Sequence, residues 1–202
     1  SDVSSLATLT NLNGLELSGN QINNISPLAG LTHLTSLDIS YNYLNIRSGS
    51  AAMDIIAHFF ARFTAVDYAP QNSYLVGRYV FYNASKFDGN DPTANASDDA
   101  AIATDKQALL PGQTATFANY TNYSAGINGI VVDFAYLADP GSVGPGEFLL
   151  SVGNGNNPST WTPYTGGVQV AARAGAGANG SDRVELIFPD VAIKDEWLQV
   201  TV

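Results

Sequence analysis

The sequence contains no cysteine among its 202 residues. This absence excludes disulfide bonds, thiolate metal centres and cysteine nucleophiles together. If the protein is secreted, something other than disulfides must stabilise it. Bound calcium is a common substitute, because weak all-oxygen sites fill at the millimolar calcium concentrations found outside cells.

Basic residues and long apolar runs are also scarce. Eight Lys and Arg stand against eighteen Asp and Glu, which gives a formal net charge of −10. Nucleic-acid binding needs cations that neutralise phosphates, so we expect no nucleic-acid partner, and anionic membrane surfaces are disfavoured for the same reason. No apolar run approaches the ~20 residues of a transmembrane helix, so we expect no membrane span. The sequence opens at SDVSS without a methionine, and we interpret it as a piece of a longer protein.

Sequence patterns for catalysis are missing as well. A nucleophilic triad needs a histidine base near a serine, and both histidines lie in the N-terminal third of the chain. No phosphate loop, dinucleotide fingerprint or His-rich metal motif occurs. A carboxylate pair for glycoside hydrolysis is conceivable by count alone, but Asp133 and Glu185 alternate in their strands as outward positions would. Asp182, next to Arg183, suggests a surface ion pair. We therefore predict a protein that is not an enzyme.

What the N-terminal part does have is a repeat with a period of 22 residues. NLNGLELSGNQINNISPLAGL, from Asn11, aligns with HLTSLDISYNYLNI, from His33. The pattern L-x-x-L-x-L-x-x-N is the leucine-rich repeat signature. Leucines of a short strand point inward, and the asparagine satisfies backbone groups where the chain turns. The outward strand positions form a small, polar face: Glu16, Ser18, Ser36, Asp38 and Ser40.

Two repeats are too few to stand alone, so we expect a closing element. SGSAAMDIIAHFFARF predicts a capping helix with Ser50 as its N-cap. Apolar residues follow at helical spacing: Met53, Ile56, Phe59, Phe60 and Phe63. The following AVDYAP predicts a last strand that Pro70 ends. With a short linker at residues 70–72, the first domain covers residues 1–72.

Residues 73–202 have a different character. They are rich in Gly, Asn, Thr and β-branched or aromatic residues, with turn signals every ~10 residues. Seven segments read as strands: YLVGRYVFYN, ATFANY, GIVVDFAYL, EFLLSVGN, GVQVAARAG, DRVELIFPD and EWLQVTV. Only DDAAIATDKQALL suggests a short helix. We predict an antiparallel β-sandwich of jelly-roll or immunoglobulin-like type, which makes the whole chain mainly β with a small α/β solenoid part.

An acidic stretch, FDGNDPTANASDDAAIATDK, stands near the start of this second part. It is not an EF-hand, because the glycine of that template is replaced by Thr93. Calcium accepts six to eight oxygens in loose geometry, so two acidic clusters could converge on one ion. The predicted metal ligands are Asp88, Asn90, Asp91, Asp98 and Asp99. The alternative is a solvated acidic loop. In either case Asp98 or Asp99 could cap the short helix.

Aromatic residues in polar loops supply candidate ligand-binding positions. NYTNYS contains Tyr120 and Tyr123, and NPSTWTPY contains Trp161 and Tyr164. A ring face can cover the apolar face of a pyranose while neighbouring amides and hydroxyls bind its hydroxyl groups. The alternative is that these rings cover the ends of the sandwich.

Both parts resemble families of bacterial extracellular proteins. The repeats, with the phrase ISPLAGLTHL, resemble internalin-like 22-residue leucine-rich repeats. Residues 78–202, from GRYVFYNASKFDGNDPTANASDDAAIATDKQALLPGQ to GSDRVELIFPDVAIKDEWLQVTV, are similar to a β-rich accessory domain of large secreted proteins of planctomycete-type bacteria. That domain often precedes a dockerin-type segment. The resemblance implies an extracellular, multidomain, non-catalytic setting and carries no established site residues.

Two functional hypotheses follow. The first is a secreted binding module in which a calcium-stabilised sandwich recognises a carbohydrate or cell-surface polysaccharide, with strength from multivalency in the parent protein. The second is a protein-interaction or adhesion fragment, in which the repeat face binds a protein and the sandwich is a spacer. In both cases the protein is secreted or extracellular, and the rest of the parent protein could attach it to the cell surface.

Overall fold

The structure, a computed structural model, describes residues 2–62 and 64–202. The chain divides into two compact units. Unit 1 comprises residues 1–74 with 135–138, and unit 2 comprises residues 75–134 with 139–202. In the described ranges, no helix is long and apolar enough to cross a membrane.

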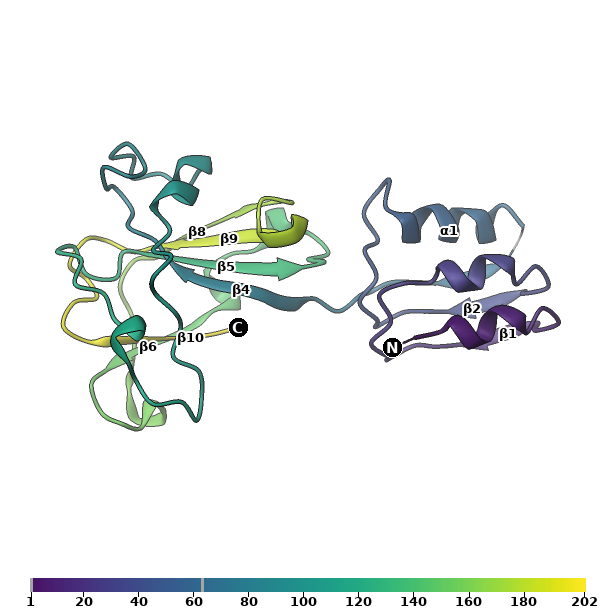
Figure 1. The fold of residues 1–202 in the computed structure, drawn as a ribbon, viewed down its shortest axis with the longest axis horizontal. Helices are drawn as coiled ribbons and strands as arrows, with labels where there is room; N and C mark the ends of the chain where they lie inside the picture. Colours follow the sequence, from purple (N-terminus) through teal and green to yellow (C-terminus); the bar gives the residue numbers. More distant parts are fainter. Residues whose placement is uncertain (1, 63) are drawn as a thin grey trace. The chain divides into compact units, whose positions relative to one another are not determined.

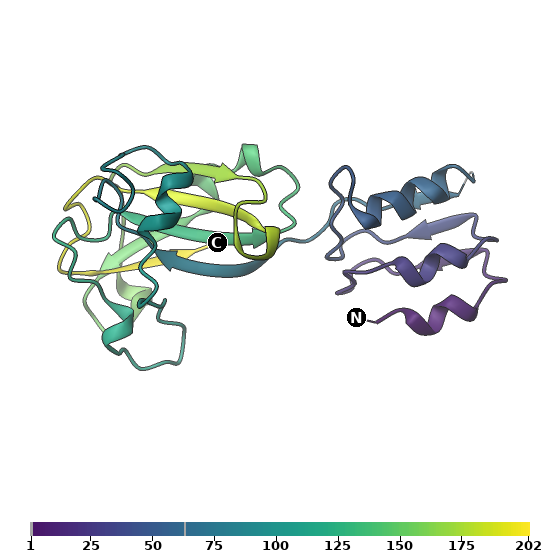
Figure 2. The ribbon, with the colours of Figure 1, turned by 45° about the horizontal axis from the view of Figure 1, so that its top comes forward.

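Unit 1 is a short solenoid in which helical segments and strands alternate along the chain (Figure 1). Its elements in chain order are η1 (Ser4–Thr8), β1 (Gly14–Glu16), η2 (Ser26–Gly30), β2 (Ser36–Asp38), α1 (Ala51–Phe60) and β3 (Ala65–Asp67). The strands form a parallel sheet in the order β1-β2-β3. Figure 2 shows the helical segments η1, η2 and α1 side by side on one face of this sheet. The predicted last strand, AVDYAP, is therefore confirmed as β3.

The interior of unit 1 is apolar and contains Leu28, Leu37, Ile39 and Leu44, each almost fully buried. Polar side chains are buried there as well, and Asn42 is the most deeply buried of those that the structure describes. Asn42 is fully buried; its Oδ1 accepts from the Ile22 N–H at 3.0 Å, and its Nδ2 donates to backbone carbonyls of residues 17, 39 and 40. Buried backbone groups are nearly always hydrogen-bonded. Asn42 supplies such bonds where the chain turns, as the repeat pattern predicted.

A less regular third repeat follows. The helix α1 begins after Ser50, whose Oγ accepts from the Met53 N–H at 3.2 Å, so the predicted helix and its N-cap are confirmed. Ile56 and Phe59 are buried in the solenoid core, whereas Phe63 lies outside the described residues. Gln71 takes the turn-supporting role of the asparagine: its Oε1 accepts from the Leu44 N–H at 3.0 Å, and its Nε2 donates to the Ile39 carbonyl. That this end caps the array stays a prediction.

Unit 2 contains two sheets. Its strands are β4 (Tyr74–Val80), whose first residue belongs to unit 1, β5 (Gly129–Ala135), β6 (Leu149–Gly153), β7 (Thr162–Pro163), β8 (Gln169–Arg173), β9 (Asp182–Ile187) and β10 (Trp197–Thr201). One sheet has the order β4-β5-β9-β8 and the other β10-β6-β7. The registers β5–β9, β8–β9, β10–β6 and β6–β7 are antiparallel. Six of the seven predicted strands form, and the type of sandwich stays a prediction.

One predicted strand, ATFANY, is wrong. It forms the single turn η4 (Phe117–Asn119), in which the Thr116 N–H donates to Asn119 Oδ1 at 2.7 Å. The threonine and asparagine side chains offer the backbone local hydrogen bonds that replace a strand ladder.

The predicted outward positions of three acidic residues are also wrong. Asp133, Asp182 and Glu185 are all fully buried. Arg183 donates to both oxygens of Asp133, from Nε at 2.9 Å and from a terminal nitrogen at 2.8 Å, and Arg173 Nε donates to Glu185 at 3.0 Å. Paired arginines offset part of the cost of burying Asp133 and Glu185. Alternation along the strands therefore does not indicate which acidic side chains are exposed here.

Candidate functional site

Most of the acidic stretch lies in a long loop, residues 81–101, which we call the acidic excursion, and hydrogen bonds fix both ends of this loop. It leaves β4 and returns where the Tyr82 N–H donates to the Ala101 carbonyl at 3.1 Å and the Ala103 N–H donates to the Val80 carbonyl at 2.9 Å. Only residues 96–101 are helical, as a short 3-10 segment, η3 (Ala96–Ala101). Its N-cap is Asn95, not Asp98 or Asp99. Asp98 instead accepts from the Asn95 N–H at 2.7 Å, as the third residue of a capping box.

Two of the predicted metal ligands hold the local turn, Asp91 through its carboxylate and Asn90 through its backbone N–H. Asp91 accepts from Thr93 Oγ1 at 2.7 Å, from the Thr93 N–H at 2.9 Å and from Asn95 Nδ2 at 2.8 Å. These bonds, above all that from the threonine hydroxyl, lower the pKa of Asp91. Asn90 has a left-handed backbone, with φ of 62°, and its N–H donates to the Ser85 carbonyl and to Asp88. Asp91 and Asn90 therefore fix the turn.

Asp99 belongs to an arginine network. Arg183 donates to its Oδ1 at 2.7 Å, and Arg173 also hydrogen-bonds it. Partial burial alone would raise the pKa of Asp99, but the two guanidinium groups outweigh it and hold that pKa below the usual value. In the same network, burial raises the pKa of Glu185 despite its bond from Arg173. These residues tie the acidic excursion to β8 and β9.

Asp88 and Asp98 differ from the others because they are buried, at 4% and 0% exposure. Each carboxylate uses one oxygen: Asp88 Oδ1 accepts from the Asn90 N–H, and Asp98 Oδ2 accepts from the Asn95 N–H. The second oxygen of each is buried without a hydrogen-bond partner. Burial raises the pKa of Asp98, and the neighbouring Asp88 charge adds to the rise. In the described residues, no group of three His, Asp or Glu side chains is arranged to hold a metal ion.

The predicted aromatic pair of the 157–164 loop is packed against its own unit. The Trp161 indole N–H donates to the Gly155 carbonyl at 2.9 Å, and its ring lies on Gly153, where an added Cβ would come within 2.6 Å. Tyr164 packs edge-on against buried Phe188, and its hydroxyl donates to the Gly167 carbonyl. Both rings thus make the contacts expected of rings that cover the protein's own surface.

The two tyrosines of the second predicted pair, Tyr120 and Tyr123, differ in exposure. Tyr123 stacks on Tyr82 with ring centroids 4.7 Å apart, and its hydroxyl lies 3.4 Å from the Asn83 carbonyl. Tyr120 is 50% exposed and meets Phe117, which is 68% exposed, at 5.1 Å in an edge-to-face contact. Phe117 was missed because ATFANY alternates like a strand. Its place beside asparagine and tyrosine in a turn was the available signal.

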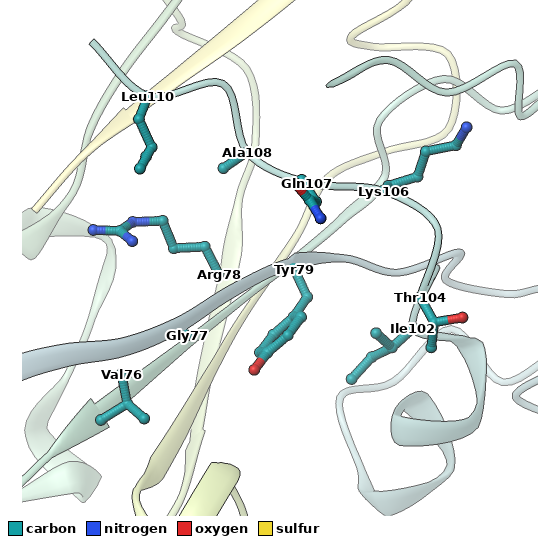
Figure 3. Close-up of a pocket in the computed structure, with 10 residues that line it drawn as sticks. All are labelled: Val76, Gly77, Arg78, Tyr79, Ile102, Thr104, Lys106, Gln107, Ala108 and Leu110. Atoms are coloured by element: carbon teal, nitrogen blue, oxygen red, sulfur yellow. The ribbon is translucent and has the colours of Figure 1, made fainter. Parts of the chain in front are cut away.

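A shallow groove of about 410 Å³ lies beside this pair, between β4 and residues 102–110 (Figure 3). It contains Arg78 and Lys106, two of the few cations of the chain. Figure 3 shows them extending in opposite directions, so they do not converge on one ligand. The Lys106 ammonium instead lies 4.3 Å from the centre of the Phe117 ring, as a cation–π contact.

The strand face of unit 1 carries a row of three carboxylates. The parallel register places Glu16 beside Asp38 and Asp38 beside Asp67. The side chains of Glu16 and Asp67 are exposed and that of Asp38 is half-exposed. Asp38 accepts from Ser40 Oγ at 2.7 Å, and this bond is the main cause of its lowered pKa. The lowered pKa keeps Asp38 anionic at neutral pH.

Comparison with known proteins identifies the repeats. Residues 10–48 match the family described as Leucine Rich repeats (2 copies), which confirms the repeat prediction for that part of the chain. No curated protein and no solved structure matches the chain significantly. The resemblance of the C-terminal part to a planctomycete-type accessory domain stays a prediction.

Proposed function

We propose that this chain is a non-catalytic binding fragment whose leucine-rich repeat part engages a protein through its strand face. The observation that carries the proposal is the register of Glu16, Asp38 and Asp67 in adjacent parallel strands. Adjacent strands lie ~4.8 Å apart, so three negative charges form one short line. Leucine-rich repeats commonly bind proteins, and this line favours a partner with Lys or Arg on its surface.

The test distinguishes the effect of these three carboxylates on binding from the effect of the overall net charge of −10. The immobilised chain is titrated with a 20-residue Lys/Arg-rich peptide, as a probe for a basic protein surface, at low and moderate salt. The triple variant Glu16→Gln, Asp38→Asn and Asp67→Asn should weaken binding roughly 5-fold or more, because the local potential is lost. The matched variant Asp54→Asn, Asp105→Asn and Asp195→Asn removes the same charge elsewhere and should change binding less than about 2-fold. Equal weakening by both variants would refute the proposal.

A second candidate, glycan recognition by unit 2, is favoured by the exposed Phe117–Tyr120 pair. Backbone and side-chain bonds fix this turn: Asn119 Nδ2 donates to the Gln107 carbonyl at 3.1 Å, and the Gln107 N–H donates to the Ala118 carbonyl at 2.7 Å. Fixed aromatic rings beside amides suit the apolar face and the hydroxyls of a sugar. Of the four aromatics predicted to bind ligand, Tyr120 is exposed and the other three are partly buried.

Affinity electrophoresis over neutral polysaccharides tests this candidate. Retardation that disappears in Phe117→Ala/Tyr120→Ala, but persists in Tyr41→Ala, would support it. Tyr41 is the matched control because it is similarly exposed, at 53%, but lies in unit 1. Unchanged mobility on every polysaccharide would exclude it. The extracellular location is part of both candidates and is supported by the resemblances described above.

A further inference from the structure

Three buried side-chain oxygens of the acidic excursion have no hydrogen-bond partner among the described residues: Asn83 Oδ1, Asp88 Oδ2 and Asp98 Oδ1. Their side chains are only 4%, 4% and 0% exposed. Buried polar groups in folded proteins are nearly always bonded, and an unpaired one costs free energy. Three such atoms in one short segment call for a common explanation.

The chain path brings these residues into one neighbourhood. Asn83 and Asp88 lie on the outgoing limb and Asp98 on the returning limb, and the limbs are joined by the Tyr82–Ala101 backbone bond. The Asp88 carboxylate acts electrostatically on Asp98 and also on the Tyr123 hydroxyl, which bonds the Asn83 carbonyl. The three residues therefore belong to two limbs that meet at the base of the excursion.

The chemistry of the three atoms selects their ligand. All are acceptors, and two belong to carboxylates, so a water molecule with two donor hydrogens cannot bond all three or cancel the charge. One proton shared by the two carboxylates would still leave the Asn83 oxygen unpaired and one negative charge without a counter-charge. The nearby arginines are occupied, since Arg173 pairs with Asp99 and Glu185, and Arg183 pairs with Asp99 and Asp133. A divalent cation would satisfy all three oxygens and neutralise both carboxylates.

We propose that Asn83 Oδ1, Asp88 Oδ2 and Asp98 Oδ1 are ligands of a calcium ion. An all-oxygen donor set on irregular backbone suits calcium, whereas zinc prefers nitrogen and sulfur, and magnesium demands near-ideal octahedral geometry. The set differs from the sequence-based one because it adds Asn83 and leaves out Asn90, Asp91 and Asp99. The carboxylates of Asp91 and Asp99 have other partners. Backbone carbonyls and water would complete the coordination.

The test uses the full chain and two readouts. Both tryptophans belong to unit 2, so their fluorescence follows the melting of that unit. Relative to chelator, 10 mM calcium should raise its melting temperature by roughly 5–10 °C, as expected for an ion at about 100 times its Kd. Terbium should bind in place of calcium and emit when tyrosines are excited, because Tyr82 and Tyr123 adjoin the site. Added calcium should displace it.

Conservative variants identify the ligands. Asp88→Asn and Asp98→Asn should each abolish the calcium shift and weaken terbium binding at least about 10-fold, since each removes a ligand charge. In chelator both should melt at or above the wild-type temperature because the repulsion between the carboxylates is removed, which shows that they fold. Asp91→Asn is the matched control and should keep the whole shift. A wild-type melting temperature that calcium leaves unchanged would overturn the proposal, as would an Asp91→Asn loss equal to that of Asp98→Asn.

Discussion

The two units bury polar side chains in different ways. Unit 1 buries neutral amides, Asn42 and Gln71, which hydrogen-bond backbone groups at the turns of the solenoid. Unit 2 also buries an amide, Asn128, but it adds charged groups: Arg183 pairs with Asp133, and Arg173 pairs with Glu185, in each case from a neighbouring strand. Each amide bonds backbone groups of the adjoining repeat, which any sequence supplies, whereas each ion pair requires one particular charged side chain as its partner. The two units should therefore respond differently when one polar group is removed.

The largest effect should come from breaking the charge network of unit 2. Arg183→Met leaves Asp133 buried without its bidentate partner, and losing one member of a buried pair costs about 3–5 kcal/mol. Denaturant unfolding followed by tryptophan fluorescence measures this loss. Arg78→Met is the matched control because Arg78 is exposed on β4, and it should cost less than about 0.5 kcal/mol. Equal losses in the two variants would mean that the network does not stabilise the unit.

A smaller effect should follow in unit 1 from Asn42→Ala. This change leaves the buried Ile22 N–H without its acceptor, at roughly 1–3 kcal/mol for such a group, whereas the carbonyls of residues 17, 39 and 40 keep other donors. Hydrogen exchange of peptides covering residues 15–45 should speed up accordingly. Asn20→Ala is the control, because exposed Asn20 bonds only the carbonyls of residues 17 and 18 and water can replace it. If the two variants exchange alike, the buried amide is not what holds the turn.

The same contrast explains what could be read from the sequence. The repeat was predictable because Leu37 and Asn42 recur at fixed spacing, and each makes contacts that the spacing itself defines. Asp133 and Glu185 were misplaced because alternation marks a face of the strand, and nothing local reveals that an arginine from another strand covers it. Likewise the acidic stretch was recognisable from its sequence. Packing decides that Asp98 keeps one oxygen without a partner and that Asp99 contacts two arginines.

The buried carboxyl groups of unit 2 can titrate, whereas the buried amides of unit 1 cannot. The buried groups of unit 2 therefore make its stability depend on pH. Burial raises the pKa of Glu185 above its ordinary 4.5, opposed by Arg173 and assisted by Asp98 and Asp99. A raised pKa means that the folded form binds the proton more tightly. This contribution to stability is therefore full below pH 4.5 and is lost as the pH rises through the folded pKa.

The neutral variant Glu185→Gln should remove this contribution to the loss of stability with rising pH. Its unfolding free energy, measured without added calcium from pH 4 to 7, should fall less steeply than that of the wild type. Glu147→Gln provides the comparison, because Glu147 is exposed and should leave the slope unchanged. Parallel curves for Glu185→Gln and the wild type would show that this carboxyl does not titrate differently in the folded state.

The smallest effect concerns the acidic row of unit 1. Like charges on adjacent strands are mildly destabilising, by about 0.2–1 kcal/mol, and salt screens exposed charges. Asp67→Asn should therefore slow hydrogen exchange of residues 36–45 slightly at low salt, and the difference should vanish at high salt. Asp54→Asn, on the exposed side of α1, should show no such gain. A gain confined to the row would mean that unit 1 tolerates a small loss of stability to keep three carboxylates in line, which is expected of a face selected for binding. If Asp67→Asn does not slow hydrogen exchange, the three carboxylates do not destabilise unit 1, and the binding proposal then depends on the peptide titration alone.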